Sequence, residues 1–151
     1  MELVLTEMCD YLNNYFWDKK ITGTFTIENG EIAVSGLKNG QYFRIVGSTF
    51  NDGIHKYPIA SDQKLTDETF TGQIWALAIP QTVIALASDV AAWQASYGVA
   101  GSAALSPFNS ESFAGYSYSK SGNSVSGGAA TTWQDVFAGR LNKYRKIRGA
   151  R

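Results

Sequence analysis

The sequence predicts an α+β fold, in which a small antiparallel β-subdomain lies between an N-terminal helix and a set of later helices. Residues 21–79 contain short alternating stretches separated by Asn-Gly-type turns, whereas residues 1–20 and 80–98 carry apolar side chains at helical spacing. A chain of 151 residues, 44% of them hydrophobic, can form one compact domain with a buried core.

The N-terminal segment, residues 1–20, is predicted to be helical over Leu3–Trp17. Met8, Leu12 and Tyr15 recur at the three-and-four spacing that places side chains on one face of a helix. We therefore expect this helix to bury one face against the rest of the chain.

The β-subdomain over residues 21–79 is predicted to be a small barrel or sandwich of four or five short strands. Asn29-Gly30 lies between two β-rich arms, which is a strong hairpin signal. Asn39-Gly40 and Asn51-Asp52-Gly53 predict two further turns. The last extended stretch is expected to place Trp75, Leu77 and Ile79 on one face.

A central helix is predicted over residues 80–98. Pro80 suits the first turn, where its missing N–H is not needed, and Gly98 suits the left-handed residue that ends a helix. The expected buried stripe consists of Val83, Leu86, Ala87, Val90, Trp93 and Tyr97.

Residues 99–132 are rich in Gly, Ser and Ala and are interpreted as an extended, flexible assembly loop. A loop of this composition cannot bury four large rings alone, so they either pack back on their own domain or enter a neighbouring subunit. These rings are Phe108, Phe113, Tyr116 and Tyr118.

Residues 133–151 are predicted to form a C-terminal helix and a basic tail. Residues 1–139 hold all 13 acidic groups and 7 basic ones, a net charge of −6, whereas residues 140–151 hold six basic groups and no acid. This segregation predicts docking of the tail on an acidic protein surface or on nucleic acid. Because Leu141 and Tyr144 would share a helical face with Phe137, a protein partner is favoured; the alternative is that this stripe packs on its own subunit and the charges are solvated.

The residues that usually carry catalysis or bind metal are scarce. The chain has one histidine, His55, and one cysteine, Cys9, and neither lies in a metal-binding or nucleophile motif. A single cysteine excludes a disulfide within the chain and fits a reducing cytoplasm. Phosphate-binding glycine motifs, a secretory leader and a membrane-spanning apolar segment are not found in the sequence. We therefore expect no enzymatic activity, no cofactor, no metal site and no membrane association.

Two stretches near the C-terminus, one over residues 110–117 and one over residues 141–145, together resemble the head–tail connector (adaptor) proteins of tailed bacteriophages. The first is a loop after a helix, with Ser110, Glu111, Ser112, Phe113, Gly115, Tyr116 and Ser117. The second is the ending with Leu141, Tyr144 and Arg145. The resemblance covers roughly residues 80–148, and residues 21–79 depart from the mainly helical pattern of that family, so we interpret them as an inserted β-subdomain.

The resemblance implies a structural virion protein, assembled in the bacterial cytoplasm. It would form a homo-oligomeric ring, typically twelve-fold, that joins the portal protein to the next neck or tail protein and lets DNA pass through its lumen without specific binding. Interface residues are then expected at Phe108, Phe113, Tyr116, Tyr118, Leu141, Tyr144, Arg145 and Arg148. A tail-completion or stopper protein, and a carbohydrate- or ligand-binding β-module suggested by the aromatic residues, are the open alternatives.

Overall fold

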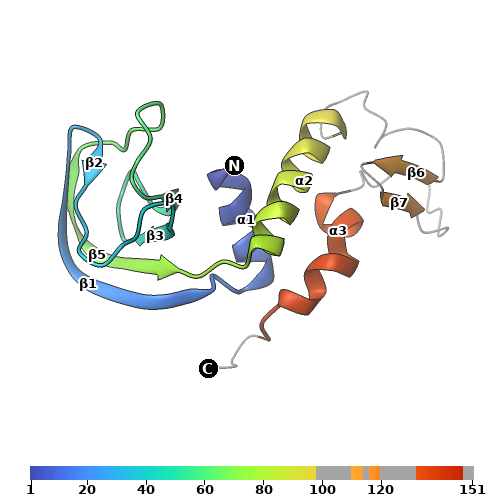
Figure 1. The fold of residues 1–151 in the computed structure, drawn as a ribbon, viewed down its shortest axis with the longest axis horizontal. Coiled ribbons are helices and arrows are strands. Elements are labelled where there is room, and N and C mark those ends of the chain that lie inside the picture. The colour runs from blue at the N-terminus through green and yellow to red at the C-terminus, as the bar shows by residue number, and fades with distance from the viewer. Residues whose placement is uncertain (98–109, 114–115, 120–131, 148–151) are drawn as a thin grey trace.

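The structure is a computed structural model and describes residues 1–97, 110–113, 116–119 and 132–147 (Figure 1). Its main sheet is a five-stranded antiparallel half-barrel with strand order β2-β1-β5-β3-β4. Figure 1 shows the helices α1, α2 and α3 gathered beside one end of this sheet. The predicted α+β class, with a helix before the β-subdomain and helices after it, is confirmed.

The first helix, α1, spans Glu2–Leu12 and is shorter than predicted. Asn13 takes a left-handed conformation with φ of 50° and its N–H donates back to the Asp10 carbonyl, which ends the helix. The side chain of Asn14 then accepts a hydrogen bond from the Phe16 N–H at 3.1 Å, a local turn that competes with helix continuation. The apolar spacing runs on to Tyr15, but two consecutive asparagines break the helix before it.

The half-barrel consists of five strands, and the predicted turns lie between them. The strands are β1 (Trp17–Glu28), β2 (Glu31–Ile32), β3 (Tyr42–Val46), β4 (Gly53–Lys56) and β5 (Glu68–Leu77). Strands β1 and β2 meet at Asn29-Gly30, both at positive φ, as the hairpin signal predicts. Gly72 in β5 is required by close packing, because a Cβ there would lie 2.1 Å from the Val46 carbonyl oxygen.

Two hydrophobic cores share the sheet. The inner core fills the half-barrel and includes Ile27, Ile32, Phe43, Ile45, Phe70 and Ile74. The outer core lies between the opposite face of the sheet and the helices and includes Leu5, Met8, Leu12, Ile54, Leu77, Val83, Leu86, Val90, Trp93, Trp133, Phe137 and Leu141. Strand β5 serves both cores by alternation, since Ile74 faces the inner core and Trp75 and Leu77 pack in the outer one.

The second half of the chain supplies two of the three helices. Helix α2 (Gln81–Tyr97) begins directly after Pro80 and buries five of the predicted stripe residues: Val83, Leu86, Ala87, Val90 and Trp93. Helix α3 (Trp133–Leu141) starts at a capping box between Thr132 and Asp135, and a short 3₁₀ helix, η2 (Asn142–Tyr144), follows it. The apolar stripe predicts a helix as far as Ile147, whereas α3 ends at Leu141 and Arg145, after η2, is extended.

Within residues 99–132, which the sequence predicts to be a flexible loop, the structure places two strands. They are β6 (Ser110–Phe113) and β7 (Tyr116–Ser119), which pair with each other in a separate two-stranded antiparallel sheet. None of the helices in the described residues combines the length and the apolar composition that a membrane span requires.

Candidate interaction surfaces

The interface residues predicted from the sequence fall into three groups. Phe108 and Arg148 lie outside the described residues. Phe113 and Tyr116 are opposite each other in the β6–β7 pair, and Tyr118 is opposite Glu111. Leu141, Tyr144 and Arg145 lie together where α3 ends and the chain crosses the end of α1.

Leu141 belongs to the chain's own core. Its exposure is 0%, and Phe137 one turn earlier is 1% exposed, so neither has surface to offer a partner. Tyr144 is partly buried against the same cluster, and its hydroxyl lies 2.7 Å from the Thr82 hydroxyl. The expectation that the Phe137–Leu141–Tyr144 stripe anchors a partner is therefore wrong for Leu141, and the intramolecular alternative describes it.

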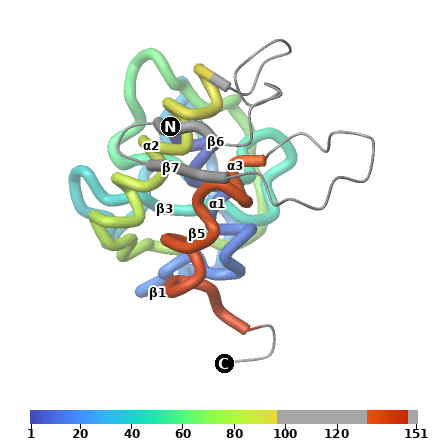
Figure 2. The backbone as a smooth tube through the Cα atoms, turned by 90° about the vertical axis from the view of Figure 1, so that its right-hand side faces the viewer, coloured from blue at the N-terminus to red at the C-terminus, as the bar shows by residue number. Residues whose placement is uncertain are grey.

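The residues after α3, Asn142–Ile147, form a segment that we call the C-terminal arm. Its backbone is held on the end of α1 by two hydrogen bonds: Lys146 N–H donates to the Leu12 carbonyl at 2.9 Å, and Asn14 Nδ2 donates to the Tyr144 carbonyl at 2.9 Å. The first bond satisfies a carbonyl that the end of a helix leaves without a partner. In Figure 2 the arm is the red stretch that follows α3 and leads toward the C-terminus.

The side chains of the arm lie over a wide groove of about 740 Å³. It is lined by Asp10, Tyr11 and Asn13 of the first helix and its cap, and by Asn142, Arg145, Lys146 and Ile147 of the arm. The Arg145 guanidinium lies 5.0 Å from the centre of the Tyr11 ring. At the end of the arm, Ile147 is 82% exposed. The arm thus presents cations and one exposed apolar side chain on a fixed backbone.

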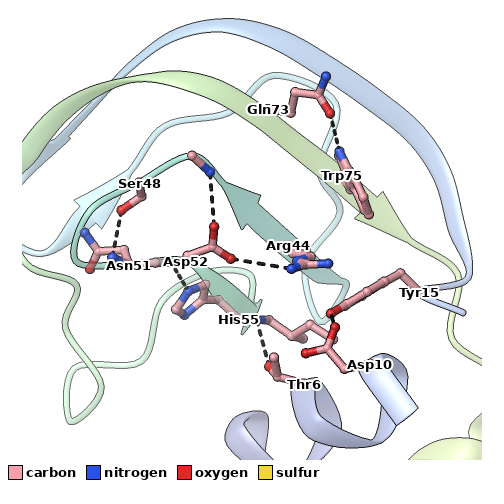
Figure 3. Close-up of polar contacts among 12 residues, drawn as sticks. Thr6, Asp10, Tyr15, Arg44, Ser48, Asn51, Asp52, His55, Gln73 and Trp75 are labelled. Atoms are coloured by element: carbon pink, nitrogen blue, oxygen red, sulfur yellow. Dashed lines mark hydrogen bonds and ion pairs between the residues drawn. The ribbon is translucent and has the colours of Figure 1, made fainter. Parts of the chain in front are cut away.

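A second surface carries alternating cations and aromatic rings on the outer face of the sheet. Arg44 lies 3.8 Å from the centre of the Tyr15 ring, and Lys20 lies 3.9 Å from that of Trp75 and 4.6 Å from that of Trp17. Figure 3 shows Arg44 between Tyr15 and Asp52, with an Arg44–Asp52 ion pair of 3.6 Å. The Tyr15 hydroxyl donates to Asp10, and burial raises the pKa of Tyr15. Trp17, at 50% exposure, is the accessible end of this stack.

A third surface is the turn between β3 and β4, residues 48–51, which we call the 48–51 turn. One carboxylate, that of Glu68, accepts hydrogen bonds from the Ser48 hydroxyl, from Asn51 Nδ2 at 2.6 Å, and from the N–H groups of Thr49 and Phe50 at 3.3 and 3.4 Å. The Ser48 bond, together with the other donors, lowers the pKa of Glu68.

Asn51 fixes the turn from the other side, as Figure 3 shows for its bond with Ser48. It is 5% exposed and exchanges two hydrogen bonds with the backbone of Thr66, at 2.9 and 2.8 Å, while its own N–H donates to the Ser48 hydroxyl at 2.7 Å. Phe50, at the tip, is 67% exposed. These bonds therefore fix the backbone of the turn, while the aromatic ring of Phe50 remains exposed.

The two side chains best suited to catalysis or metal binding, His55 and Cys9, are both packed within the fold. Burial lowers the pKa of His55, whose Nε2 lies 2.9 Å from the Asn51 carbonyl and whose ring packs on Phe43. Burial raises the pKa of Cys9 to about 12, so its thiol stays protonated at neutral pH and is a poor nucleophile. No cluster that could hold a metal ion occurs among the described residues.

The sequence prediction missed Phe50 and Trp17 as exposed anchors. A large apolar residue at the tip of a Ser-Thr-Phe-Asn-Asp turn was the available signal for Phe50. Trp17 was assigned to the first helix, and only the strand register shows it on the sheet surface.

The chain was compared with protein-family models, with curated proteins and with solved structures, and none of them matches it.

Proposed function

We propose that this protein is a structural subunit of the head–tail connector of a tailed bacteriophage, in which copies form a ring between the portal protein and the next neck or tail protein. The proposal is supported by the resemblance of residues 110–117 and 141–145 to adaptor proteins. It is also supported by surfaces suited to protein contacts, namely exposed apolar side chains on fixed backbone.

The observation that carries the proposal is the C-terminal arm. Its base is attached to α1 through the backbone of Tyr144 and Lys146, so Arg145 and Lys146 extend from a defined position. A cationic segment ending in the exposed Ile147 suits an acidic protein surface with an apolar patch, because arginine can hold a carboxylate in a bidentate pair while the aliphatic side chain is buried. Duplex DNA offers phosphates to the cations, but it offers little apolar surface that could cover Ile147.

The acidic remainder of the chain fits the same role. Residues 1–139 carry a net charge of −6, and a ring lined by this surface would repel the phosphates of DNA that passes through it. DNA that passes through the ring without specific binding requires a repulsive surface and no contacts to its bases.

The test is co-assembly with the portal protein encoded near this chain, followed by mass measurement of the complexes. The charge-reversed variant R145E/K146E should lose incorporation, whereas K38E/K64E, which reverses two exposed lysines of the β-subdomain, should retain it. Incorporation of R145E/K146E at the wild-type level would contradict docking through the arm. Salt-sensitive binding of duplex DNA that this variant loses would favour the nucleic-acid reading instead.

Truncation after Gly139 is a poor version of this experiment, because it also removes the buried Leu141. Charge reversal at Arg145 and Lys146 leaves Leu141 in the core, so it tests docking through the arm without disturbing the packing. The position of the ring in assembled particles would then distinguish an adaptor from a tail-completion or stopper protein.

One observation favours the second candidate, a carbohydrate-binding β-module. Trp17 is 50% exposed beside Lys20, and polar Thr24 and Thr71 pair across the neighbouring sheet surface at 3.0 Å. An exposed indole can stack on a sugar ring. Binding of the isolated protein to a glycan array, lost in W17A, would support this candidate over the connector.

A further inference from the structure

The surface where β1 begins adjoins the C-terminal arm. The Phe16 ring packs edge-on against the Tyr144 ring of the arm, with ring centres 6.3 Å apart, and Asn14 donates to the Tyr144 carbonyl at 2.9 Å. Trp17 is the next residue after Phe16, and its side chain is 50% exposed. An exposed indole therefore lies beside the cationic arm.

The indole of Trp17 is supported from within the fold. The Lys20 amine lies 4.6 Å from the centre of the Trp17 ring and 3.9 Å from that of Trp75. Trp75 is fixed in turn, because its Nε1–H donates to Gln73 Oε1 at 2.8 Å and the Tyr15 ring packs edge-on against it at 5.7 Å. An aromatic ring supported in this way loses little conformational freedom when a partner covers it.

The cations around Trp17 and on the arm rest on aromatic rings. Lys20 lies on two indoles, the Lys143 amine lies 4.9 Å from the centre of the Tyr144 ring, and the Arg145 guanidinium lies 5.0 Å from that of Tyr11. Within the described residues, none of these three cations forms an ion pair with a carboxylate. Their charges are positioned but not neutralised.

Arginines elsewhere in the described fold are neutralised. Arg44 and Arg140 each form an ion pair with an aspartate, at N–O distances of 3.6 and 2.9 Å, whereas Arg145 has no such partner among the described residues. Two carboxylates lie near this surface: Asp10 accepts a hydrogen bond from a tyrosine hydroxyl, and Asp18 is exposed. Neither is ion-paired with the cations described above. The positive charges therefore remain available to the carboxylates of a partner.

We propose that Trp17 and the C-terminal arm form one docking site for an acidic segment of a partner protein. Trp17 and Ile147 cover apolar side chains of that segment, while Lys20 and Arg145 hold its carboxylates. The inference deepens the proposed function and rests on it for the partner, a neighbouring protein of the connector. Tryptophan and arginine are among the residues that most often carry the energy of an interface. An aromatic ring flanked by cations also suits single-stranded nucleic acid, but the exposed Ile147 favours a protein.

The experiment selects a library of random short peptides on the immobilised full-length chain. Peptides that combine Asp or Glu with a neighbouring large apolar residue should be enriched. Their affinity, measured by fluorescence anisotropy, should fall by roughly 30-fold in W17A. No enrichment, enrichment of peptides without carboxylates, or equal affinity for W17A would overturn the proposal.

Two further variants separate the ring from the charges and from general exposure. K20Q/R145Q keeps Trp17 and should weaken the same peptides at low salt, with less dependence of the affinity on salt. L3A is the matched control, because Leu3 is 72% exposed and lies about 14 Å along α1 from Leu12, to which the arm is attached. It should bind like the wild-type chain. Loss of peptide binding in L3A equal to that in W17A would contradict a site at Trp17.

The competing ligands are tested on the same chains. Binding of oligo-thymidine or of a glycan that W17A abolishes, without enrichment of acidic peptides, would assign the surface to nucleic acid or carbohydrate and overturn the proposal. The two proposals also fail in different ways. Acidic peptides that bind through Trp17 without portal assembly would refute the connector and leave the docking site standing. Portal assembly that W17A leaves at the wild-type level would refute the docking site and leave the connector standing.

Discussion

The 48–51 turn and the C-terminal arm are both exposed, yet they are built by opposite means. In the turn, the Glu68 carboxylate and the Asn51 side-chain amide form several hydrogen bonds with the Ser48 hydroxyl and the nearby backbone, and these bonds hold the turn in one conformation. In the arm, two hydrogen bonds fix the backbone while the side chains of Lys143, Arg145 and Lys146 lie in solvent. The turn offers a preorganised apolar anchor, and the arm offers adjustable charge.

This difference separates two properties that a subunit of an assembly needs. A rigid anchor lowers the entropy lost on binding and so favours a long-lived contact. Exposed charges raise the rate at which oppositely charged surfaces meet, and they do so less at high salt. We therefore expect the turn to govern dissociation and the arm to govern encounter.

The largest expected effect concerns the boundary between the arm and the core. L141A should lower the free energy of unfolding by about 3 kcal/mol, because it removes a fully buried side chain and leaves a cavity. I147A, six residues later in sequence, should change it by less than about 0.5 kcal/mol, because Ile147 is 82% exposed. Urea denaturation of both variants measures the difference. Equal effects would mean that the boundary between core and arm does not lie between these two residues.

The second prediction weakens the turn. N51A leaves the Thr66 N–H and carbonyl without their side-chain partners and removes one donor to Glu68, so it should lower the free energy of unfolding by about 2 kcal/mol. F50A should leave stability nearly unchanged, because the ring is exposed. Thermal unfolding of the two variants is the measurement. A comparable loss in F50A would place the ring in the chain's own core and contradict its role as an anchor.

The sequence was sufficient to predict the elements whose signals are local. Asn29-Gly30 specifies a tight turn by its backbone preference, and the α2 stripe from Val83 to Trp93 is a simple consequence of helical spacing. The helix α1 was predicted too long because the apolar pattern continues past Leu12, while the decisive event is the left-handed Asn13. Helix-ending residues of this kind act through conformation rather than hydrophobicity.

The surfaces were harder to predict because they depend on residues far apart in the chain. Glu68 reaches the 48–51 turn across 20 residues, and Asn14 reaches the carbonyl of Tyr144 across 130. Leu141 was assigned to an interface because its stripe is apolar, and a stripe alone does not say whether its partner is the same chain or another one. Only the tertiary structure shows that the partner is the core formed by α1 and α2.

The third prediction sharpens the comparison through pH. Burial lowers the pKa of His55 in the folded state, so below its ordinary value of about 6.5 the unfolded chain binds a proton more readily than the folded one does. Stability should therefore fall as the pH drops from 7 toward 5, and H55Q should show a weaker fall over this window. Melting temperatures at each pH measure it. An unchanged pH dependence in H55Q would assign the effect to other groups.

The smallest expected effect on stability belongs to the charges of the arm. Arg145 and Lys146 are exposed, and the contact of Arg145 with the Tyr11 ring is a cation–π pair of the weak, solvated kind. R145E/K146E should therefore change the free energy of unfolding by less than about 1 kcal/mol, since exposed charges contribute little. The same variant should slow association with the portal protein, and the wild-type rate should approach the variant's rate as salt is raised toward 1 M, where screening acts within about 3 Å. Stopped-flow measurements at low and high salt test this. A rate that is independent of both salt and charge reversal would show that the arm does not guide the encounter, while a large loss of stability would show that its charges hold the fold together.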